Sequence, residues 1–252
     1  MLEVKDLKVS FGGLVALNLD TFSIRKNELR VIIGPNGAGK STFMDIVCGK
    51  TKPQQGSVKF KGLELLGRKE VEIAKLGVGR KFQKPSIFSG LTVYDNLLLG
   101  LDGPKDVFTS YFYKLASYDK DRIVEVAEKV GLIDDLTMIA GSLSHGKKQW
   151  LEIAIVMLQD SELMLIDEPA AGMSDVEAEK TGNLLCDLSK KHSVIVIEHD
   201  MKFVEQIAIE KVSVLVRGQM LTEGTFQEVR NNQEVIDCYL GSANSAQQKA
   251  HS

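Results

Sequence analysis

The sequence contains little cysteine, little proline and no long hydrophobic segment. Its three cysteines, Cys48, Cys186 and Cys238, are far apart and form no Cys-x-x-Cys pair. A disulfide framework or a zinc site needs closer and more numerous ligands, so the cysteine pattern argues against both. Cys48 and Cys186 lie in apolar helical patterns and are expected to be small buried side chains. No apolar run approaches the roughly 18 to 20 residues that span a bilayer, so the chain is not expected to cross a membrane by itself.

An excess of charge of one sign is also lacking. The chain has 31 Lys and Arg residues against 34 Asp and Glu residues, a net charge of −3. Nucleic-acid binding favours a basic surface, so no nucleic-acid partner is expected. With 44% hydrophobic and 26% charged residues, the 252-residue chain has the composition of an ordinary globular protein with a sizeable core. The N-terminus lacks the apolar stretch of a signal peptide and is expected to begin with a strand in a cytosolic protein.

What the sequence does contain is a complete phosphate loop. Residues 34–41 read Gly-Pro-Asn-Gly-Ala-Gly-Lys-Ser and directly follow the apolar run 29–33. A strand that enters a glycine-rich turn and then a helix aims several backbone N–H groups at one point, where a triphosphate binds. Lys40 is expected to reach the β- and γ-phosphates, and the Ser41 hydroxyl to bind Mg²⁺. The chain is therefore predicted to bind a nucleoside triphosphate.

Hydrophobic periodicity predicts an α/β protein. Alternating segments around the phosphate loop predict short strands that form an antiparallel sheet beside the nucleotide core, at 2–4, 7–9, 22–24 and 58–60. Continuous apolar runs predict strands buried on both faces of a parallel sheet, at 29–33, 163–166, 194–197 and 212–216. Helices are expected between these last strands, at 175–190 and 201–209.

The remaining segments are predicted to be helical or irregular. From 92 to about 159 the pattern is helical, with Thr92 or Asp95 as an N-cap. Residues 102–118, with five aromatics and a Gly-Pro pair, are expected to form a loop or a broken helix. Residues 241–252 have almost no core-forming side chains and are expected to be disordered.

Two carboxylates follow the strand predicted at 163–166. If this strand lies beside the phosphate-loop strand, Asp167 is brought to the Mg²⁺ and Glu168 is placed to polarise the water that attacks the γ-phosphate. His199 likewise follows a buried strand, where it can contact a γ-phosphate or be merely structural. Gln83 can offer its amide to Mg²⁺ or to the attacking water, or face solvent.

A second anion site is indicated far along the chain. Ser144 and Gly146 precede an apolar helical run, and a helix N-terminus offers free N–H groups and the positive end of a dipole. The alternative is an ordinary serine cap beside a solvated lysine pair. Phe11, at the end of an early strand, can stack on an adenine or belong to the core.

Taken together and in this order, these strings resemble the ATP-binding subunits of ABC transporters, from the first strand to about Leu240. The resemblance implies ATP and Mg²⁺ as ligands, with Phe11 stacked on adenine and with Ser144 and Gly146 as the core of the signature motif. It makes Glu168, His199 and Gln83 catalytic, and Ser41, Gln83 and Asp167 the metal-binding residues. The phosphate loop is then the Walker A motif, whose nucleotide-binding residues are Gly34, Asn36, Gly37, Ala38, Gly39, Lys40, Ser41 and Thr42.

The resemblance also implies a fold and partners. The fold is that of a P-loop NTPase, with a RecA-like core, an antiparallel β subdomain and a helical subdomain at about 88–155, within an ABC ATP-binding domain at 1–240 and before a disordered tail at 241–252. Family members pair head to tail, with each ATP between the Walker A motif of one subunit and the signature of the other. The implied partners are a second ABC ATPase subunit, identical or different, two transmembrane permeases and a periplasmic binding protein. The chain would lie peripherally on the cytoplasmic face of the inner membrane.

Two motifs depart from the usual family pattern. In the signature, Lys147 replaces the neutral amide of Leu-Ser-Gly-Gly-Gln, while Ser144 and Gly146 are kept. In the D-loop, Ser174 stands where many members have aspartate, and Asp175 is a candidate substitute.

Within the family, the chain resembles the urea branch of the branched-chain amino acid importer group, on the strings 79–85, 142–150 and 171–173. The predicted function is therefore the ATP-hydrolysing motor of a urea importer. The alternatives are the ATPase of a branched-chain amino acid importer or of a lipopolysaccharide exporter. ABC ATPases of DNA repair and translation usually have a coiled-coil insertion or two cassettes, which this chain lacks. An inactive ATP-binding subunit is disfavoured because Lys40, Glu168 and His199 are all present.

Overall fold

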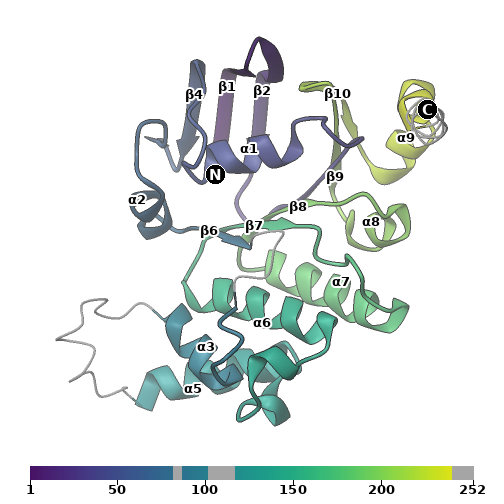
Figure 1. Cartoon of the computed structure of the whole chain (residues 1–252). Helices are drawn as coiled ribbons and strands as arrows, with labels where there is room; N and C mark the ends of the chain where they lie inside the picture. The colour runs from purple at the N-terminus through teal and green to yellow at the C-terminus, as the bar shows by residue number, and fades with distance from the viewer. Residues whose placement is uncertain (82–86, 102–116, 240–252) are drawn as a thin grey trace.

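The computed structural model describes residues 1–81, 87–101 and 117–239, which form two β-sheets and the helices that cover them (Figure 1). Three sequence predictions fall outside these residues. They concern Gln83, most of the irregular segment at 102–118, and the tail at 241–252.

The N-terminal half supplies the predicted antiparallel sheet. Its strands lie in the order β2-β1-β4-β5 and span Leu2–Phe11 (β1), Leu14–Ile24 (β2), Gln55–Phe60 (β4) and Leu63–Glu64 (β5). The segments expected at 2–4 and 7–9 are one strand. Its alternation is interrupted at Asp6, which has a positive φ of 49°, where the register against β4 shifts. A bulge of this kind adds a residue and so hides a continuous strand from a period-two pattern.

The second sheet has six strands in the order β10-β9-β3-β8-β7-β6. Its five parallel strands include every strand predicted from a continuous apolar run, and β10 pairs antiparallel with β9. Their bounds are Leu29–Ile33 (β3), Val78–Lys81 (β6), Leu163–Asp167 (β7), Ser193–Ile197 (β8), Lys211–Val216 (β9) and Gln219–Gly224 (β10). The sequence patterns did not predict β6 and β10, the two edge strands.

The six-stranded sheet separates two hydrophobic cores. Because neighbouring strand residues face opposite sides, Val31 and Ile33 pack into one core while Ile32 packs into the other. Helix α1 (Lys40–Val47) and the antiparallel sheet cover one face, and α6 (His145–Leu158), α7 (Asp175–Ser189) and α8 (Met201–Ile207) cover the other (Figure 1). The sheet therefore stands between the phosphate-loop helix and the helix that begins after Ser144.

Further helices in the described part of the chain lie at Glu70–Lys75 (α2), Val93–Gly100 (α3), Ser117–Lys129 (α5) and Phe226–Arg230 (α9), with 3₁₀ turns at Ile133–Asp135 and Ala140–Ser142. Of the two predicted caps, Thr92 is the N-cap of α3, because its hydroxyl accepts a hydrogen bond from the Asp95 backbone N–H. Within the part of the chain that the structure describes, no helix has the length and apolar character needed to span a bilayer.

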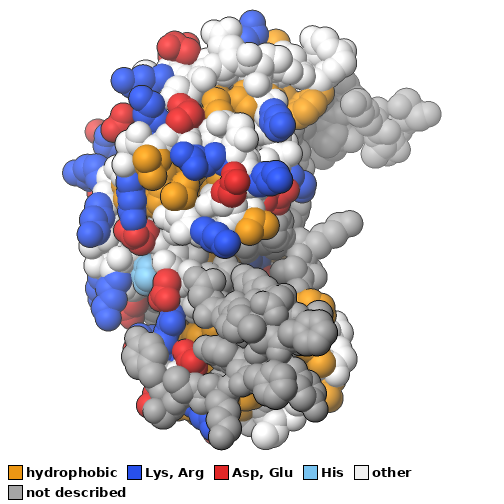
Figure 2. All heavy atoms as spheres, turned by 90° about the vertical axis from the view of Figure 1, so that its left-hand side faces the viewer, with side chains coloured by type: hydrophobic (Ala, Val, Ile, Leu, Met, Phe, Trp, Pro, Cys, Tyr) orange, Lys and Arg blue, Asp and Glu red, His pale blue; other side chains and the backbone are white. Residues whose placement is uncertain are grey.

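The cysteines are free thiols, as the sequence predicts. Cys48 is buried at the end of α1, as expected, whereas Cys186 on α7 is only partly buried. On the face shown in Figure 2, Lys and Arg side chains are interspersed with Asp and Glu side chains.

Candidate nucleotide-binding site

The phosphate loop joins the central strand β3 to α1. The strand is buried along its whole length and pairs in parallel with β8 and β9, so the loop starts at the middle of the sheet. Asn36, Gly37 and Ser41 are exposed, whereas Ala38 is buried and anchors the loop. An exposed loop at the carboxyl edge of a parallel sheet, directly before a helix, is the geometry that binds phosphate groups.

Two glycines of this loop are required by their surroundings. A Cβ atom on Gly34 would lie 2.0 Å from the Leu215 carbonyl oxygen of β9, so no larger residue fits without moving the strand. Gly39, the N-cap of α1, has a left-handed φ of 97°, and a Cβ atom there would lie 2.5 Å from the Ala16 carbonyl oxygen. The loop thus lies close against β9 and β2.

The Lys40 amine is held by the loop itself. Its Nζ donates hydrogen bonds to the carbonyl oxygens of Gly34, at 2.5 Å, and Pro35, at 3.1 Å. Burial lowers the pKa of Lys40, and the negative charges of Glu168 and Asp167 oppose this effect. The amine therefore interacts electrostatically with both carboxylates, and it lies within the loop that surrounds the predicted phosphate position.

Asp167 ends β7 as a buried carboxylate. Burial raises the pKa of Asp167, while the positive charge of Arg80 acts in the opposite direction. Arg80 Nη2 lies 3.7 Å from Asp167 Oδ2, and Arg80 Nη1 donates to Asp45 of α1 at 2.5 Å. Arg80 was not among the predicted site residues, because it lies on a strand that the periodicity missed.

Glu168 and His199 face each other after neighbouring strands. The register places Asp167 beside Ile197, so the residues that follow β7 and β8 meet at one edge of the sheet. His199 Nδ1 lies 3.4 Å from Glu168 Oε1, and both side chains are partly accessible to solvent. Glu168 has a positive φ of 46°, and its N–H donates to the Ile197 carbonyl oxygen. A non-glycine residue in this conformation is uncommon and is often found at functional sites.

A buried carboxylate that sequence analysis missed supports this pair. Glu198 is 1% exposed and accepts hydrogen bonds from the backbone N–H groups of Ala170, His199 and Asp200. Burial raises the pKa of Glu198, and these N–H groups oppose the effect. Glu198 thus ties the segment after Glu168 to the segment that carries His199. Its only signal in the sequence was its place directly before His199.

Ser144 and Gly146 lie on the opposite face of the sheet from the phosphate-loop helix, at the start of α6 (Figure 1). Ser144 is exposed and is the N-cap of α6, and its hydroxyl accepts from the Lys147 backbone N–H. Gly146 packs against the Glu177 carboxylate, which a Cβ atom would approach to 2.4 Å. One chain therefore does not bring its own phosphate loop and its own signature together.

The unusual signature residues have partners within the chain. Lys147 Nζ donates to both Asp135 carboxylate oxygens, at 2.9 and 2.7 Å, so its charge is paired beside the signature. His145 Nε2 lies 2.9 Å from the Ala171 carbonyl oxygen and 3.3 Å from the Gln149 amide nitrogen. In the D-loop, Ser174 is the N-cap of α7, whereas Asp175 is exposed and pairs with Lys202.

Phe11 lies on the surface. It ends β1 at the tip of the β1–β2 hairpin and is 54% exposed, which excludes the interpretation that it is a core residue. The same hairpin packs on the phosphate loop, because Ala16 and Leu17 of β2 lie against Gly39. Phe11 is thus an accessible aromatic ring on an element that borders the loop.

If Phe11 stacks on adenine, Phe11→Ala is expected to weaken ATP binding by on the order of ten-fold, because base–aromatic stacking contributes about 1–3 kcal/mol. Fluorescence titration of the isolated chain measures the dissociation constant. Leu14→Ala is the matched control, since Leu14 is an exposed apolar residue of the same hairpin. Phe11→Trp should restore binding, and an unchanged constant in Phe11→Ala would show that the ring does not contact the base.

The predicted metal ligands that the structure describes are oxygen donors. Ser41 follows Lys40 in the first turn of α1, and the negative charge of Asp167 acts to raise the pKa of that lysine. A hydroxyl and a carboxylate suit Mg²⁺, which usually keeps several waters and binds phosphate oxygens. In residues 1–81, 87–101 and 117–239, no group of three or more His, Cys, Asp or Glu side chains is placed to hold a metal ion. The hydroxyl of Ser41 and the carboxylate of Asp167 therefore fit a metal bound together with a nucleotide.

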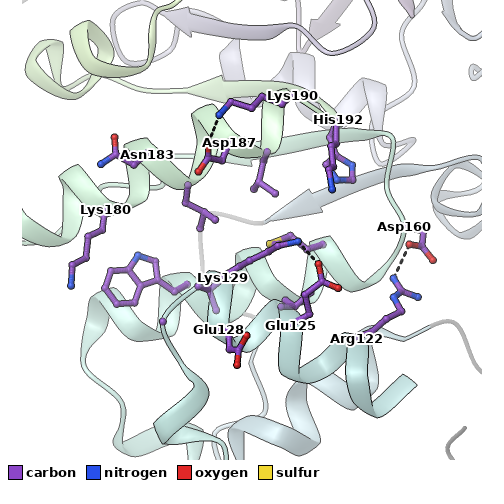
Figure 3. A pocket seen from close by; sticks show the side chains of 18 residues that line it. Arg122, Glu125, Glu128, Lys129, Asp160, Lys180, Asn183, Asp187, Lys190 and His192 are labelled. Atoms are coloured by element: carbon purple, nitrogen blue, oxygen red, sulfur yellow. Dashed lines mark hydrogen bonds and ion pairs between the residues drawn. The ribbon is translucent and has the colours of Figure 1, made fainter. Parts of the chain in front are cut away.

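A pocket of about 800 Å³ lies elsewhere, between α5, α6 and α7 (Figure 3). Its lining includes Trp150 and Met157 and the ion pairs Lys129–Glu125 and Lys190–Asp187. None of the residues predicted to bind nucleotide lines it. The pocket is therefore separate from the phosphate loop.

Two sequence families match the chain. The family described as "ABC transporter" matches residues 17–171, and the family described as "Branched-chain amino acid ATP-binding cassette transporter" matches residues 219–244. The first match covers more than half of the chain, and the second covers β10, α9 and the residues that follow up to 244.

Individual proteins are similar over almost their full length. The "High-affinity branched-chain amino acid transport ATP-binding protein LivG" of Salmonella typhimurium is 35% identical, over 96% of this chain and 98% of its own length. The similarly described BraF of Pseudomonas aeruginosa is 34% identical, with the same coverage. Among solved structures, the ADP conformation of MJ1267, described as "an ATP-binding cassette of an ABC transporter", superposes with a TM-score of 0.85 at 28% identity, over 96% of this chain and 98% of that chain.

Proposed function

The chain belongs to the ABC transporter family, and we propose that it is the ATP-hydrolysing subunit of an importer for branched-chain amino acids. As a member of this family it has the ABC ATPase fold, binds ATP and is an ATPase coupled to transport. The observation that carries the amino acid proposal is the full-length similarity to relatives described as branched-chain amino acid transport proteins.

Urea is the second candidate solute. It is supported by the strings at 79–85, 142–150 and 171–173, whereas the curated relatives favour the amino acid alternative. The ATPase of an importer does not itself touch the solute. The choice between the two solutes therefore needs a transport measurement.

Within the site, we propose that Gly34, Asn36, Gly37, Ala38, Gly39, Lys40, Ser41 and Thr42 bind the phosphates of ATP. The Lys40 amine would exchange its carbonyl partners in the loop for phosphate oxygens. Glu168 would accept a proton from the attacking water, and His199, within 3.4 Å of Glu168, would contact the γ-phosphate. Ser41, Asp167 and Gln83 would hold Mg²⁺, which would neutralise charge on the phosphate oxygens.

Two chains are needed to complete the proposed site. Because Ser144 and Gly146 lie across the sheet from the phosphate-loop helix, their anion-binding groups would serve the ATP of a second ABC subunit, identical or different. We further propose that residues 88–155, within an ATP-binding domain at 1–240, contact two permease subunits. The chain would then lie peripherally at the cytoplasmic face of the membrane and, in the full importer, work with a periplasmic binding protein.

The test is uptake of labelled leucine and labelled urea by cells of the source organism that carry Glu168→Gln. Loss of leucine uptake with normal urea uptake is the expected result. Loss of urea uptake alone would assign the chain to urea import, and loss of neither would favour the exporter alternative. Cosedimentation with membranes or with ribosomes separates a transport subunit from a translation factor. Glu179→Gln is the control, since Glu179 is an exposed carboxylate on α7.

A further inference from the structure

A buried ammonium group lies where three elements of the site meet. Lys81 is the last residue of β6, and its side chain is fully buried. Its Nζ lies 3.6 Å from Glu152 Oε2 on α6 and donates a hydrogen bond of 3.3 Å to the carbonyl oxygen of Asp167. One side chain thus connects β6, the helix that begins at the signature, and the end of the strand that carries Asp167. The mechanism proposed above does not use it.

The preceding residue makes the complementary connection on the other face. Arg80 and Lys81 are neighbours on β6, so their side chains point to opposite sides of the sheet. Arg80 contacts Asp45 of α1 and the carboxylate of Asp167, whereas Lys81 contacts Glu152 and the carbonyl group of Asp167. Asp167 is therefore held from both faces, once through its side chain and once through its backbone.

The Lys81 ammonium group is paired with a carboxylate that is itself buried, because the Glu152 side chain is only 2% exposed. Removal of one partner of a buried ion pair leaves an uncompensated charge and is strongly destabilising, whereas replacement of both partners by apolar side chains is often neutral or stabilising. The need for a packed interior therefore does not by itself explain an ion pair at this position. What an ion pair adds to apolar packing is a defined direction and distance between the elements it joins.

We propose that Lys81 is a positioning residue that links the nucleotide site to the signature helix: with Arg80 it clamps Asp167 between α1 and α6, through Asp45 and Glu152. A change at Asp167 when nucleotide binds is then carried to α6, which presents Ser144 and Gly146 to the second subunit. This inference rests on the proposed roles of Asp167 and of the signature. It assigns a function to a fully buried residue that is not part of the proposed nucleotide site.

The test compares full-length wild-type protein with Lys81→Met, with the double variant Lys81→Met/Glu152→Leu, and with a control double variant, Arg30→Met/Glu28→Leu. The control removes the Arg30–Glu28 ion pair, whose side chains are also buried, with 4% and 2% exposure. Unlike the Lys81–Glu152 pair, this pair joins neither α6 nor Asp167 to another element. Three properties are measured: the melting temperature, the dissociation constant for a non-hydrolysable ATP analogue with Mg²⁺, and hydrogen exchange of the α6 amides with and without that analogue.

Lys81→Met alone is expected to lower the melting temperature by several degrees, because it leaves Glu152 buried without its ammonium partner. The apolar double variant is expected to recover most of this loss and to bind the analogue within about two-fold of wild type. Its nucleotide-dependent change in α6 exchange is nevertheless expected to be at least about five-fold smaller than that of the wild type and of the control.

The inference would be overturned if the nucleotide-dependent change in α6 hydrogen exchange were the same in the double variant as in the wild type. It would also be overturned if nucleotide did not change α6 hydrogen exchange in the wild-type protein. Either result, obtained with a chain that supports normal solute uptake, would leave the proposed function intact. Loss of analogue binding or of hydrolysis by the wild-type chain would instead count against the proposed function.

Discussion

Glu168→Gln is expected to leave ATP binding intact and to lower kcat for ATP hydrolysis by about 10²- to 10⁴-fold, the range for loss of a general base. Glutamine has nearly the same size and keeps a hydrogen-bonding group near His199, so the geometry of the site is preserved. It cannot accept a proton from water at neutral pH. Hydrolysis should therefore fail at the chemical step while the bound triphosphate persists.

Phosphate release under single-turnover conditions measures this loss, and competition with a fluorescent analogue measures ATP affinity. Glu179→Gln makes the same chemical change at an exposed position on α7 and should behave as wild type. Hydrolysis at the wild-type rate in Glu168→Gln would falsify the assignment of Glu168 as the base. Loss of ATP binding in the same variant would instead indicate that this carboxylate shapes the phosphate site.

Ser144→Arg is expected to abolish ATP-dependent pairing without affecting ATP binding by a single chain. Ser144 is exposed at the N-terminus of α6, across the sheet from the phosphate-loop helix, so an arginine there cannot reach the nucleotide of its own chain. At the interface with a second subunit it would fill the space proposed for that subunit's ATP. It would also remove the hydroxyl that caps α6.

Sedimentation velocity with and without ATP measures pairing, best in a Glu168→Gln background that keeps the nucleotide unhydrolysed. Thr225→Arg is the matched control, because Thr225 is the N-cap of α9 and its loss costs a similar cap, about 1 kcal/mol. A Ser144→Arg chain that pairs normally would exclude Ser144 from the interface. Thr225→Arg should pair as wild type.

Buried strands made of consecutive apolar residues were predictable from the sequence. The apolar runs at 163–166 and 194–197 became the buried strands β7 and β8, and the two acidic residues after the first run mark the sheet edge correctly. In contrast, β6 reads Val-Gly-Arg-Lys and looks like a turn or a solvated segment. Its two basic side chains are buried only because partners distant in sequence, Asp45, Glu152 and Asp167, neutralise them. No local pattern contains that information.

The same limit applies to the site. The phosphate loop is contiguous, so its residues could be named from the sequence. The partner of Lys147 is Asp135, twelve residues earlier and in a different element, and the paired charge could not be deduced from the signature alone. Glu198 was overlooked because a carboxylate beside a histidine gives no sign of whether it is buried. Its backbone N–H partners on His199 and Asp200 are its neighbours in sequence, but the third partner, Ala170, is brought near only because β7 and β8 are adjacent.

The separation of phosphate loop and signature on opposite faces of one sheet has a genetic consequence. If two identical chains pair head to tail, a chain defective at Lys40 and a chain defective at Ser144 form a mixed pair with one damaged composite site and one intact site. The intact site takes its phosphate loop from the second chain and its signature from the first. Two alleles that are each inactive alone would thus complement each other, whereas two different lesions within the phosphate loop would not.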